Sequence, residues 1–579
     1  MPTESARNWR TLISFLWPYR GRIVVGSLLA MVGTVAGLWT PRIVESVIEH
    51  LWAGTSVAGD VMLFGALTLV YIVAVLTQWA IMGRAAEKVV YDVREALVAR
   101  FLRGRVAEIR ERATADLVAR ATADAPLLQV TVTLGFVSFI TAITGVVGSI
   151  VLMGVIDGLM LGVTLAAVAV LGVAMAAIMP KAGRERALAQ EAVGAMSTEL
   201  DGSMRALRTI KAAGAERSHS DAVLADAAKA RNHGIKALWA EVMAYETGFG
   251  GMQVVTVVMV AFGAWRVTQG ELEIPALVAF IMYTQGFIMP LMQMADGFST
   301  IQQGLAASKR IAEAQEIPLE EEAVTASTGA ADRDDATPVL AFESVTARYK
   351  PSEDDIVRGL DLVVPRRGHL AIVGPSGAGK SSLVSLALRF LSPRSGTIRL
   401  DGVPYEELTY AQVRSRFAYV EQEPPVLPGT VRDNLEPTEP KASDDELYAV
   451  LEAVDLADDV AALENGLDTE LVGATMTGGG RQRLAIARAL LTGAEILVLD
   501  DATSQIGGRA EEAIHRATRA AAQRAAVVTI ATRATTAATA DTVVVLEEGR
   551  VRATGTHAEL LATDALYRDL AAPAAALAA

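Results

Sequence analysis

Long apolar stretches recur in the first half of the chain, whereas short apolar runs alternate with polar segments in the second half. Six of the long stretches, together with their weakly polar flanks, are long enough to cross a bilayer as α-helices, which takes about 20 residues. They lie at 23–38, 62–82, 130–153, 159–179, 252–267 and 275–294. This pattern predicts an all-α transmembrane domain of six helices over residues 1–316.

The charges of the connecting loops predict how the spans are oriented. Loop 83–125 carries nine Lys and Arg residues and loop 181–245 is similarly basic, whereas 50–60 and 154–158 carry none. Lys and Arg accumulate on the cytoplasmic side of membrane proteins. We therefore predict a multi-pass protein of the cell membrane, in which both termini and both long loops are cytoplasmic.

The two long loops have helical periodicity and few helix breakers. Each is predicted to contain two helices that continue the spans into the cytosol at ~1.5 Å per residue. The hairpins are interpreted either as solvated helical pairs or as levers that contact a cytosolic motor. At the start of the chain, residues 7–22 are predicted to form a helix at the membrane interface, with Trp9, Trp17 and Tyr19 in the headgroup layer.

Few charged residues lie beside the apolar stretches. Asp157 marks a tight turn between the third and fourth stretches. Arg42 and Glu45 are three positions apart, a spacing that places both on one face of a helix, and we predict that they satisfy each other near the outer leaflet. Arg266 and Asp296 are the other charges near the spans. Charges within a membrane are functional candidates by default, but none of these is assigned to a substrate.

The composition limits the classes of partner. Apolar residues make up 52% of the 579 residues, which disfavours a soluble globular protein. Residues 1–316 carry 27 Lys and Arg against 26 Asp and Glu, whereas residues 317–579 carry 25 against 40. The acidic second half disfavours nucleic acid as a partner.

The absence of cysteine excludes disulfides and thiolate chemistry. Arg exceeds Lys and Ala is abundant, a composition typical of a GC-rich bacterium.

Residues 317–338 are polar and acidic and are predicted to be a linker. From 339 to 579, β-rich runs alternate with helical patterns, which predicts an α/β nucleotide-binding domain. Within it, Gly374, Gly379, Lys380 and Ser381 satisfy the P-loop pattern G-x-x-x-x-G-K-[ST], between a predicted strand and a predicted helix. The residues predicted to bind ATP in this loop are Gly374, Pro375, Ser376, Gly377, Ala378, Gly379, Lys380, Ser381 and Ser382.

The chemistry of this pattern is specific. Glycines allow backbone N–H groups to surround phosphates, Lys380 would reach the β- and γ-phosphates, and the Ser381 hydroxyl would bind Mg²⁺. A second strand, "ILVLDD", ends at Asp500, whose carboxylate would hold Mg²⁺ through water. ATP and Mg²⁺ are therefore the expected ligands.

Nearly the whole chain resembles a half-transporter of the ABC exporter type, with one six-helix membrane domain fused to one nucleotide-binding domain. By this resemblance, Tyr349 stacks on adenine and Gln422 joins Mg²⁺ to the membrane-domain interface. The segments 115–124 and 207–216 are similar to the family's cytoplasmic levers, and "GRVRATGTHAELL" is similar to the segment that closes the nucleotide-binding domain. The resemblance implies ATP-driven transport of a small-molecule, lipid or peptide-like solute by a pair of half-transporters.

The sequence departs from the family pattern at the residues for hydrolysis. Asp501 replaces the glutamate that polarises the attacking water, Thr532 replaces the histidine that contacts the γ-phosphate, and Gly507 replaces an aspartate that faces the opposite subunit. An aspartate is shorter by one methylene, and misplacement of about 1 Å can cost on the order of a hundredfold in rate. Asp501 and Thr532 are thus the predicted, weakened catalytic residues.

The signature loop also departs from the family's L-S-G-G-Q, because this chain has "MTGGG". Thr477 retains a hydroxyl, Gly478 and Gly479 offer backbone N–H groups at a predicted helix N-terminus, and Gly480 replaces the glutamine. These residues are expected to complete the ATP site of the partner. The loop before them is three residues shorter than the family's form and lacks its glutamate.

Intact binding residues beside altered hydrolytic residues favour one interpretation. The chain is predicted to be the degenerate member of a heterodimer, whose partner is a different half-transporter with a more complete catalytic site, and to export an amphiphilic or apolar solute. Two alternatives stay open, a regulatory or structural subunit whose own site never cycles and an importer built on the exporter fold. A soluble ATPase acting on nucleic acid conflicts with the six spans.

Overall fold

The computed structural model describes residues 4–320, 337–350, 352–438, 442–471, 476–503, 506–531 and 534–575. The chain divides into two compact units. The first comprises Met1–Ala99 and Thr114–Glu316, and the second comprises Arg100–Ala113 and Ile317–Ala579. The segment 100–113, which falls within the predicted membrane domain of residues 1–316, thus belongs to the second unit.

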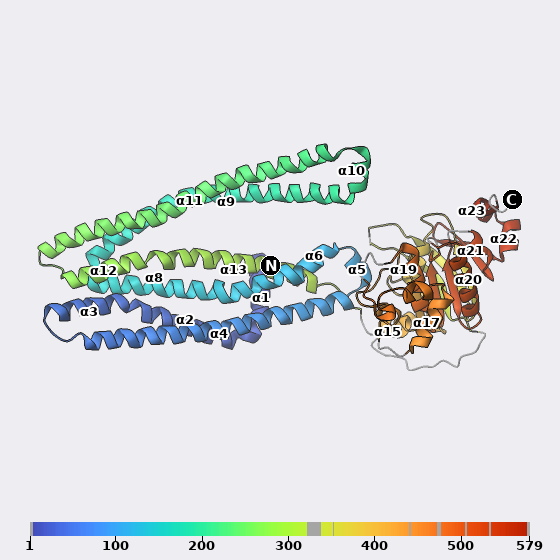
Figure 1. The fold of residues 1–579 in the computed structure, drawn as a ribbon, viewed down its shortest axis with the longest axis horizontal. Coiled ribbons are helices and arrows are strands. Elements are labelled where there is room, and N and C mark those ends of the chain that lie inside the picture. The colour runs from blue at the N-terminus through green and yellow to red at the C-terminus, as the bar shows by residue number, and fades with distance from the viewer. Residues whose placement is uncertain are drawn as a thin grey trace. The chain divides into compact units, whose positions relative to one another are not determined.

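Within the described residues, six helical stretches are long and apolar enough to span a membrane, and they form the first unit, which confirms the predicted number of spans (Figure 1). Some are interrupted by short turns or by π-helical turns, η2 and η3. The elements are α1 Glu4–Leu16, η1 Trp17–Tyr19, α2 Arg20–Leu38, α3 Thr40–Trp52, α4 Ala58–Arg103, α6 Thr114–Ala119, η2 Arg120–Asp124, α7 Ala125–Val130, η3 Thr131–Phe136, α8 Val137–Ile156, α9 Gly158–Arg205, α10 Leu207–Ala213, α11 Glu216–Thr268, α12 Ile274–Gly286 and α13 Ile288–Gln315.

The fourth and fifth spans continue as one long hairpin. Helices α9 and α11 run side by side, joined by the short helix α10, which ends at Gly214 in the left-handed region (φ 63°) (Figure 1). The predicted pair of helices in 181–245 is therefore confirmed. Ion pairs join α9 to α11, among them Glu185 to His233 at 2.7 Å between Oε2 and Nδ1.

Four of the charged residues near the spans form two pairs, whereas no partner is found for Asp296 among the described residues. Asp157 caps α9 by accepting hydrogen bonds from the backbone N–H groups of Leu159 and Met160, which confirms the predicted turn. Its other carboxylate oxygen lies 2.6 Å from the Arg266 guanidinium. Arg42 and Glu45 also form the predicted pair, at 2.7 Å. Burial of these charges is tolerated because each has a partner.

The N-terminal segment forms the predicted helix, but one of its aromatics lies elsewhere than expected. Trp17 is 59% exposed, as a headgroup residue would be, whereas Tyr19 is buried. The Tyr19 hydroxyl donates a hydrogen bond to Asp92 on α4. A tyrosine suits a headgroup layer because it has an apolar body and a polar tip, and here a carboxylate takes the place of water at that tip.

In the second unit, the end of α4 and the short helix α5 (Val106–Arg110) pack beside the start of the linker. The Arg105 N–H donates to the Pro318 carbonyl at 2.9 Å, and the Glu320 N–H donates to the Arg103 carbonyl at 3.0 Å. Two hydrogen bonds from the Arg414 guanidinium, at 2.7 and 2.8 Å, fix the Glu320 carboxylate. Bidentate pairs of this kind fix geometry well.

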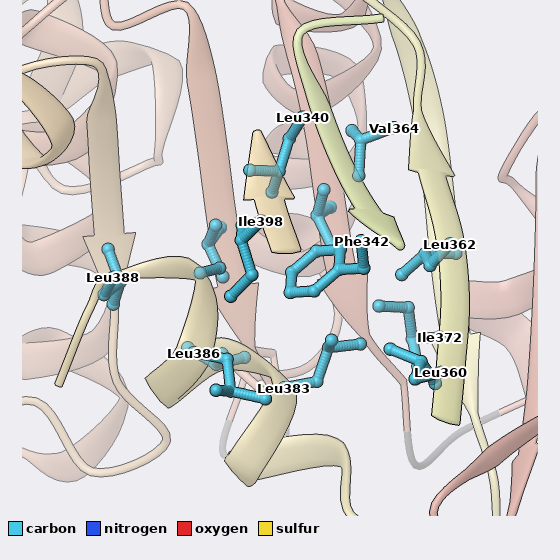
Figure 2. Close-up of a cluster of buried hydrophobic side chains, with 14 of the residues drawn as sticks. Leu340, Phe342, Leu360, Leu362, Val364, Ile372, Leu383, Leu386, Leu388 and Ile398 are labelled. Atoms are coloured by element: carbon cyan, nitrogen blue, oxygen red, sulfur yellow. The ribbon is translucent and has the colours of Figure 1, made fainter. Parts of the chain in front are cut away.

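Two sheets build the core of the second unit. The strands are β1 Leu340–Ala347, β2 Val357–Val364, β3 Gly368–Val373, β4 Ser395–Leu400, β5 Val403–Pro404, β6 Phe417–Val420, β7 Ile496–Asp500, β8 Ala526–Ile530, β9 Thr542–Glu547 and β10 Arg550–Gly555. An antiparallel sheet has the order β2-β1-β4-β5, and a mostly parallel sheet has the order β10-β9-β3-β8-β7-β6. Phe342 projects among Leu383, Ile398 and Ile372, so side chains of both sheets and of α14 (Lys380–Ala387) form one core (Figure 2).

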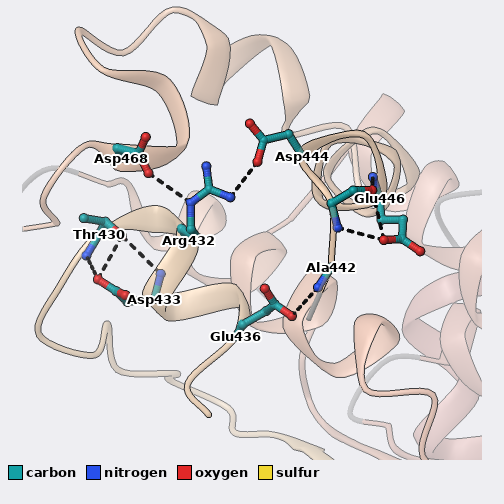
Figure 3. Close-up of polar contacts among 9 residues, drawn as sticks. Thr430, Arg432, Asp433, Glu436, Ala442, Asp444, Glu446 and Asp468 are labelled. Atoms are coloured by element: carbon teal, nitrogen blue, oxygen red, sulfur yellow. Dashed lines mark hydrogen bonds and ion pairs between the residues drawn. The ribbon is translucent and has the colours of Figure 1, made fainter. Parts of the chain in front are cut away.

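Short helices complete this unit, and several begin with well-formed caps. They are η4 Tyr405–Glu407, α15 Tyr410–Arg414, α16 Val431–Leu435, α17 Asp444–Ala453, α18 Ala457–Ala461, η5 Gly466–Asp468, α19 Gly478–Leu491, α20 Arg509–Ala522, α21 Ala534–Ala538, α22 His557–Thr563 and α23 Ala565–Ala575. Capping boxes start α16 and α17, and Arg432 bridges Asp444 at 2.6 Å and Asp468 at 3.0 Å (Figure 3). These contacts hold the helical part that carries α19, on which the signature residues lie.

Candidate nucleotide site

The parallel strands bring four segments of the predicted site to one edge of a sheet. The P-loop follows β3, Asp500 ends β7, Ala531 follows β8, and Gln422 lies two residues beyond β6. The order β3-β8-β7-β6 therefore places these segments next to one another at the carboxyl ends of the strands. Open α/β sheets bind their ligands at this edge.

A cavity of about 590 Å³ opens at this edge. It brings together the predicted catalytic residue Asp501 and most residues predicted to bind ATP and Mg²⁺, namely Gly374, Pro375, Ser376, Gly377, Gly379, Lys380, Ser381, Ser382, Gln422 and Asp500. Ala378 is buried behind the loop instead. A volume of this size is typical of small-molecule sites.

The backbone of the P-loop requires glycine at particular positions. Gly377 and Gly379 have φ of 82° and 97°, in the region that favours glycine. A Cβ on Gly374 would lie 2.3 Å from the backbone carbonyl oxygen of Leu546, so the loop could not stay in place with a side chain there. The loop backbone is thus held open for the approach of a ligand.

Lys380 begins α14 and points back into the loop. Its Nζ donates hydrogen bonds to the carbonyl oxygens of Gly374 at 2.7 Å and Pro375 at 2.9 Å. Burial lowers the pKa of Lys380, and the nearby carboxylates of Asp500 and Asp501 oppose that shift. A desolvated ammonium with two neutral acceptors suits an anionic ligand, because a phosphate would offer stronger, charge-assisted hydrogen bonds.

Asp500 is a buried carboxylate, with 8% of the residue exposed. Burial, followed by repulsion from Asp501, raises its pKa, while Lys380 and a hydrogen bond with Tyr419 lower it. With the Ser381 hydroxyl and the Gln422 amide, it offers oxygen ligands around one cavity. Among the described residues no group of three His, Cys, Asp or Glu could hold a metal by itself. The donor set fits Mg²⁺, which keeps waters and substrate phosphates as ligands.

Asp501 adopts an unusual backbone conformation. Its φ is 49°, in the left-handed region, and its N–H donates to the Ile530 carbonyl at 3.1 Å. Its Oδ2 lies 3.4 Å from the Gln422 Nε2, a long hydrogen bond. The buried Gln482 donates to the Gln422 carbonyl at 3.1 Å and so braces this loop from α19. The Asp501 carboxylate therefore lies beside Gln422 in the wall of the cavity.

The other predicted residues are placed as follows. Tyr349 is 42% exposed, does not line the cavity, and has its hydroxyl 3.5 Å from the Ser385 Oγ. Thr532 lies outside the described residues. Gly507 precedes Gly508, which caps α20 with a φ of 65°. Only 317–320 and 337–338 of the predicted linker belong to the described part of the chain.

The signature residues form the start of α19. Thr477 is its N-cap, and the Thr477 Oγ1 accepts a hydrogen bond from the Gly480 N–H at 3.1 Å. The N–H groups of Gly478 and Gly479 belong to the first turn, where the helix dipole favours anions. None of these residues lines the cavity of this chain.

Sequence reasoning missed one wall of the cavity. Tyr567, Leu570 and Ala571 of α23 line it together with Ala537 of α21. Tyr567 is 1% exposed, and its hydroxyl lies 2.6 Å from the His557 Nδ1. The signal available in the sequence was the segment 549–561, which resembles the family's closing segment, but its apolar continuation is typical of any core helix.

Comparisons with known proteins agree with this geometry. Residues 357–504 match the family described as ABC transporter, and residues 23–291 match the ABC transporter transmembrane region. The multidrug resistance-like ATP-binding protein MdlA of Escherichia coli is 28% identical over 97% of this chain and 94% of its own length. The fatty acid ABC transporter ATP-binding/permease protein of Mycobacterium bovis is 30% identical over 78% of this chain and 71% of its own length. A bacterial Atm1-family ABC exporter with ATP bound has the same fold, with a TM-score of 0.76 and 24% identity over 95% of this chain and 97% of that one.

Proposed function

The chain belongs to the ABC transporter family, as an exporter half-transporter with fused transmembrane and ATP-binding domains, and from this premise we propose that its own nucleotide site holds ATP but cleaves it slowly. ATP-driven transport is the activity of this architecture. In the proposal, the chain pairs with a different half-transporter whose site is more complete. ATP held between the two nucleotide domains favours their closed state, because the closed state binds it better than the open one.

The binding half of the proposal rests on the cavity at the strand ends. The P-loop, Lys380, Ser381, Gln422 and Asp500 surround one space. The loop glycines keep the backbone clear, and Lys380 supplies a desolvated cation. Asp500, Ser381 and Gln422 would hold Mg²⁺, which neutralises phosphate charge when it is bound. These residues bind and orient a triphosphate without any need for a general base.

The geometry of Asp501 is the main support for the proposal that this site cleaves ATP slowly. Its side chain is one methylene shorter than a glutamate, its backbone is in the left-handed region, and its carboxylate is 3.4 Å from the Gln422 amide. A group that activates water must lie within about 3 Å of the proton it accepts. We expect the water-activating oxygen to fall short by a distance that matters for rate. The substitutions at 507 and 532 act in the same direction.

The signature residues would form part of the partner's nucleotide site in the proposed pair. Thr477, Gly478 and Gly479 would meet the γ-phosphate held by the partner's P-loop. Because the Thr477 Oγ1 already accepts from the Gly480 N–H, its hydroxyl proton is left for the phosphate. We infer that this helix N-terminus still completes the partner's site, despite the loss of the signature glutamine.

The solute is proposed to be amphiphilic or apolar. The relatives bear names that refer to multidrug resistance and to fatty acids. In this chain, four charges near the outer ends of the spans form internal pairs, Arg42 with Glu45 and Asp157 with Arg266. Pairs that satisfy each other leave apolar contact as the main contribution of these helices to binding.

The test is to purify the chain with and without its partner half-transporter and to measure ATP hydrolysis. The proposal predicts a slow ATPase from this chain alone and a fast one from the pair. A fast ATPase from the chain alone would overturn it. A variant of the pair, Asp501→Ala, distinguishes slow cleavage at this site from no cleavage at all. If the variant transports solute as fast as the wild type, the chain is better described as a regulatory subunit whose own site never hydrolyses ATP.

A further inference from the structure

A basic groove lies between the first two spans, at the ends predicted to be cytoplasmic. Arg22 and Val25 of α2 and Ile81 and Arg84 of α4 line it, with Gly21 at its mouth, and its volume is about 460 Å³. Arg22 precedes the first apolar stretch and Arg84 follows the second one. Both guanidinium groups are therefore at the level where lipid phosphates lie.

Local packing holds the two arginines on opposite sides of this groove. The Tyr19 hydroxyl donates to Asp92, which fixes the start of α2 against α4. Deeper in the bilayer, Met82 of α4 reaches over Gly26 of α2, where a Cβ would lie 2.5 Å from the Met82 sulfur. With contacts on both sides of it, the groove is a built feature of the helix pair and not the product of two independent surface side chains.

The arginines of the groove make no hydrogen bond or ion pair within the described residues, although Arg22 lies close enough to Tyr19, and so to the Asp92 carboxylate that Tyr19 binds, to interact with it electrostatically. The neighbouring Lys88 also has neither contact within the described part of the chain. The nearby Glu87 accepts a hydrogen bond from the Gln129 amide at 2.7 Å. Unpaired arginines at this level favour an anion, and the planar guanidinium binds phosphate oxygens two at a time.

The surroundings of the groove are apolar and exposed. Val25 is 47% exposed, and Leu28 and Val32, at helical spacing on the same side of α2, are 55% and 48% exposed. This stripe continues from the groove toward the middle of the bilayer. It suits an acyl chain, whereas a free phosphate ion would gain nothing from it.

We propose that this groove binds the phosphate headgroup of an anionic phospholipid of the cytoplasmic leaflet, with Arg22 and Arg84 clasping the phosphate and α2 contacting an acyl chain. Basic pockets between transmembrane helices on the cytoplasmic side bind such headgroups in other membrane proteins. The site is separate from the nucleotide cavity and does not depend on the proposed hydrolysis rate. It would position the first span relative to the membrane surface.

The test is a lipid titration of the assembled transporter in detergent, followed by native mass spectrometry. The probes are phosphatidylglycerol, phosphatidylcholine with matched acyl chains, and inorganic phosphate. We expect phosphatidylglycerol to bind at least about tenfold more tightly than phosphatidylcholine. The double variant Arg22→Gln with Arg84→Gln should weaken phosphatidylglycerol binding about ten- to thirtyfold, since each cation near the surface contributes a factor of about three to five.

A matched control removes the same charge at the same depth outside the groove. Lys181→Gln with Arg184→Gln lies at the end of the fourth span, and phosphatidylglycerol binding should change less than twofold. Equal binding of both lipids, displacement of lipid by inorganic phosphate at low concentration, or equal losses from the two double variants would each overturn the proposal. If the groove variant does not assemble, Arg84→Gln alone serves, with a loss of about threefold or more expected and no loss contradicting the proposal.

Discussion

The P-loop and the edge at Asp501 border the same cavity but are constrained in opposite ways. At the P-loop, Gly374 has no room for a Cβ, Gly377 and Gly379 have φ values that favour glycine, and Lys380 makes two hydrogen bonds. At the other edge, Asp501 takes a φ that few non-glycine residues adopt, and its carboxylate accepts a long hydrogen bond from the Gln422 amide.

Binding a triphosphate and cleaving it therefore place different demands on a site. Binding needs several N–H groups and a cation around a charged ligand, and small shifts weaken it gradually. Cleavage needs one oxygen at the right distance from one water, and about 1 Å decides the rate. A chain can therefore keep the first property while it loses most of the second.

Removal of the P-loop lysine should have the largest effect, a loss of ATP affinity. Lys380→Ala should weaken ATP binding at this site about a hundredfold, because it removes a charged partner of the phosphates from a partly buried position. The measurement is nucleotide affinity of the assembled pair, with the partner's site blocked. Arg524→Ala, which removes an exposed cation after α20, is the control and should leave affinity unchanged. Equal affinities for Lys380→Ala and wild type would show that the loop does not hold the phosphates.

Two glycine substitutions in the P-loop, with smaller expected effects on stability and ATP binding, distinguish steric crowding from backbone strain. Gly374→Ala should destabilise the nucleotide unit by about 1–3 kcal/mol and weaken ATP binding about tenfold, because the new Cβ would meet the Leu546 carbonyl at 2.3 Å. Gly377→Ala meets no atom within 4 Å and should cost only about 1 kcal/mol through its φ of 82°. Thermal unfolding with and without ATP checks both. A larger loss for Gly377→Ala would reverse this ranking.

The smallest effect concerns the charge of Asp500. Burial and Asp501 raise its pKa, so its charged form costs stability as pH rises from the pKa of the unfolded chain through that of the folded chain. At neutral pH, Asp500→Asn should raise the melting temperature of the nucleotide-free protein by a few degrees. The gain should vanish below about pH 4, and stabilisation by Mg²⁺ with ATP should be lost. Asp354→Asn, at an exposed position, is the control. A lower melting temperature at neutral pH would show that hydrogen bonds to Asp500 outweigh its burial.

Features encoded in contiguous residues could be predicted from the sequence. The six spans follow from apolar length, and the P-loop follows from a pattern of eight positions, 374–381, between a strand and a helix. The pairing of Arg42 with Glu45 follows from helical spacing, and the structure has it at 2.7 Å. In each case the interacting groups are neighbours along the chain, so local periodicity suffices.

Features that depend on distant packing could not be predicted. Tyr567 lies almost two hundred residues after the P-loop whose cavity it lines, and an apolar residue on a short helix signals only a core. The same holds for Gln482, which braces Gln422, and for the buried Tyr19, whose contact with Asp92 spans 73 positions. The left-handed backbone of Asp501 likewise depends on the sheet around it, because its N–H pairs with β8.

The most direct test asks what each site contains after one turnover. The assembled pair is given photoreactive ATP labelled on the α-phosphate, is crosslinked at successive times, and the nucleotide bound to each chain is identified. The account predicts triphosphate on this chain after the partner's nucleotide has become diphosphate, and about tenfold faster cleavage here in Asp501→Glu. Cleavage at equal rates on both wild-type chains would contradict it.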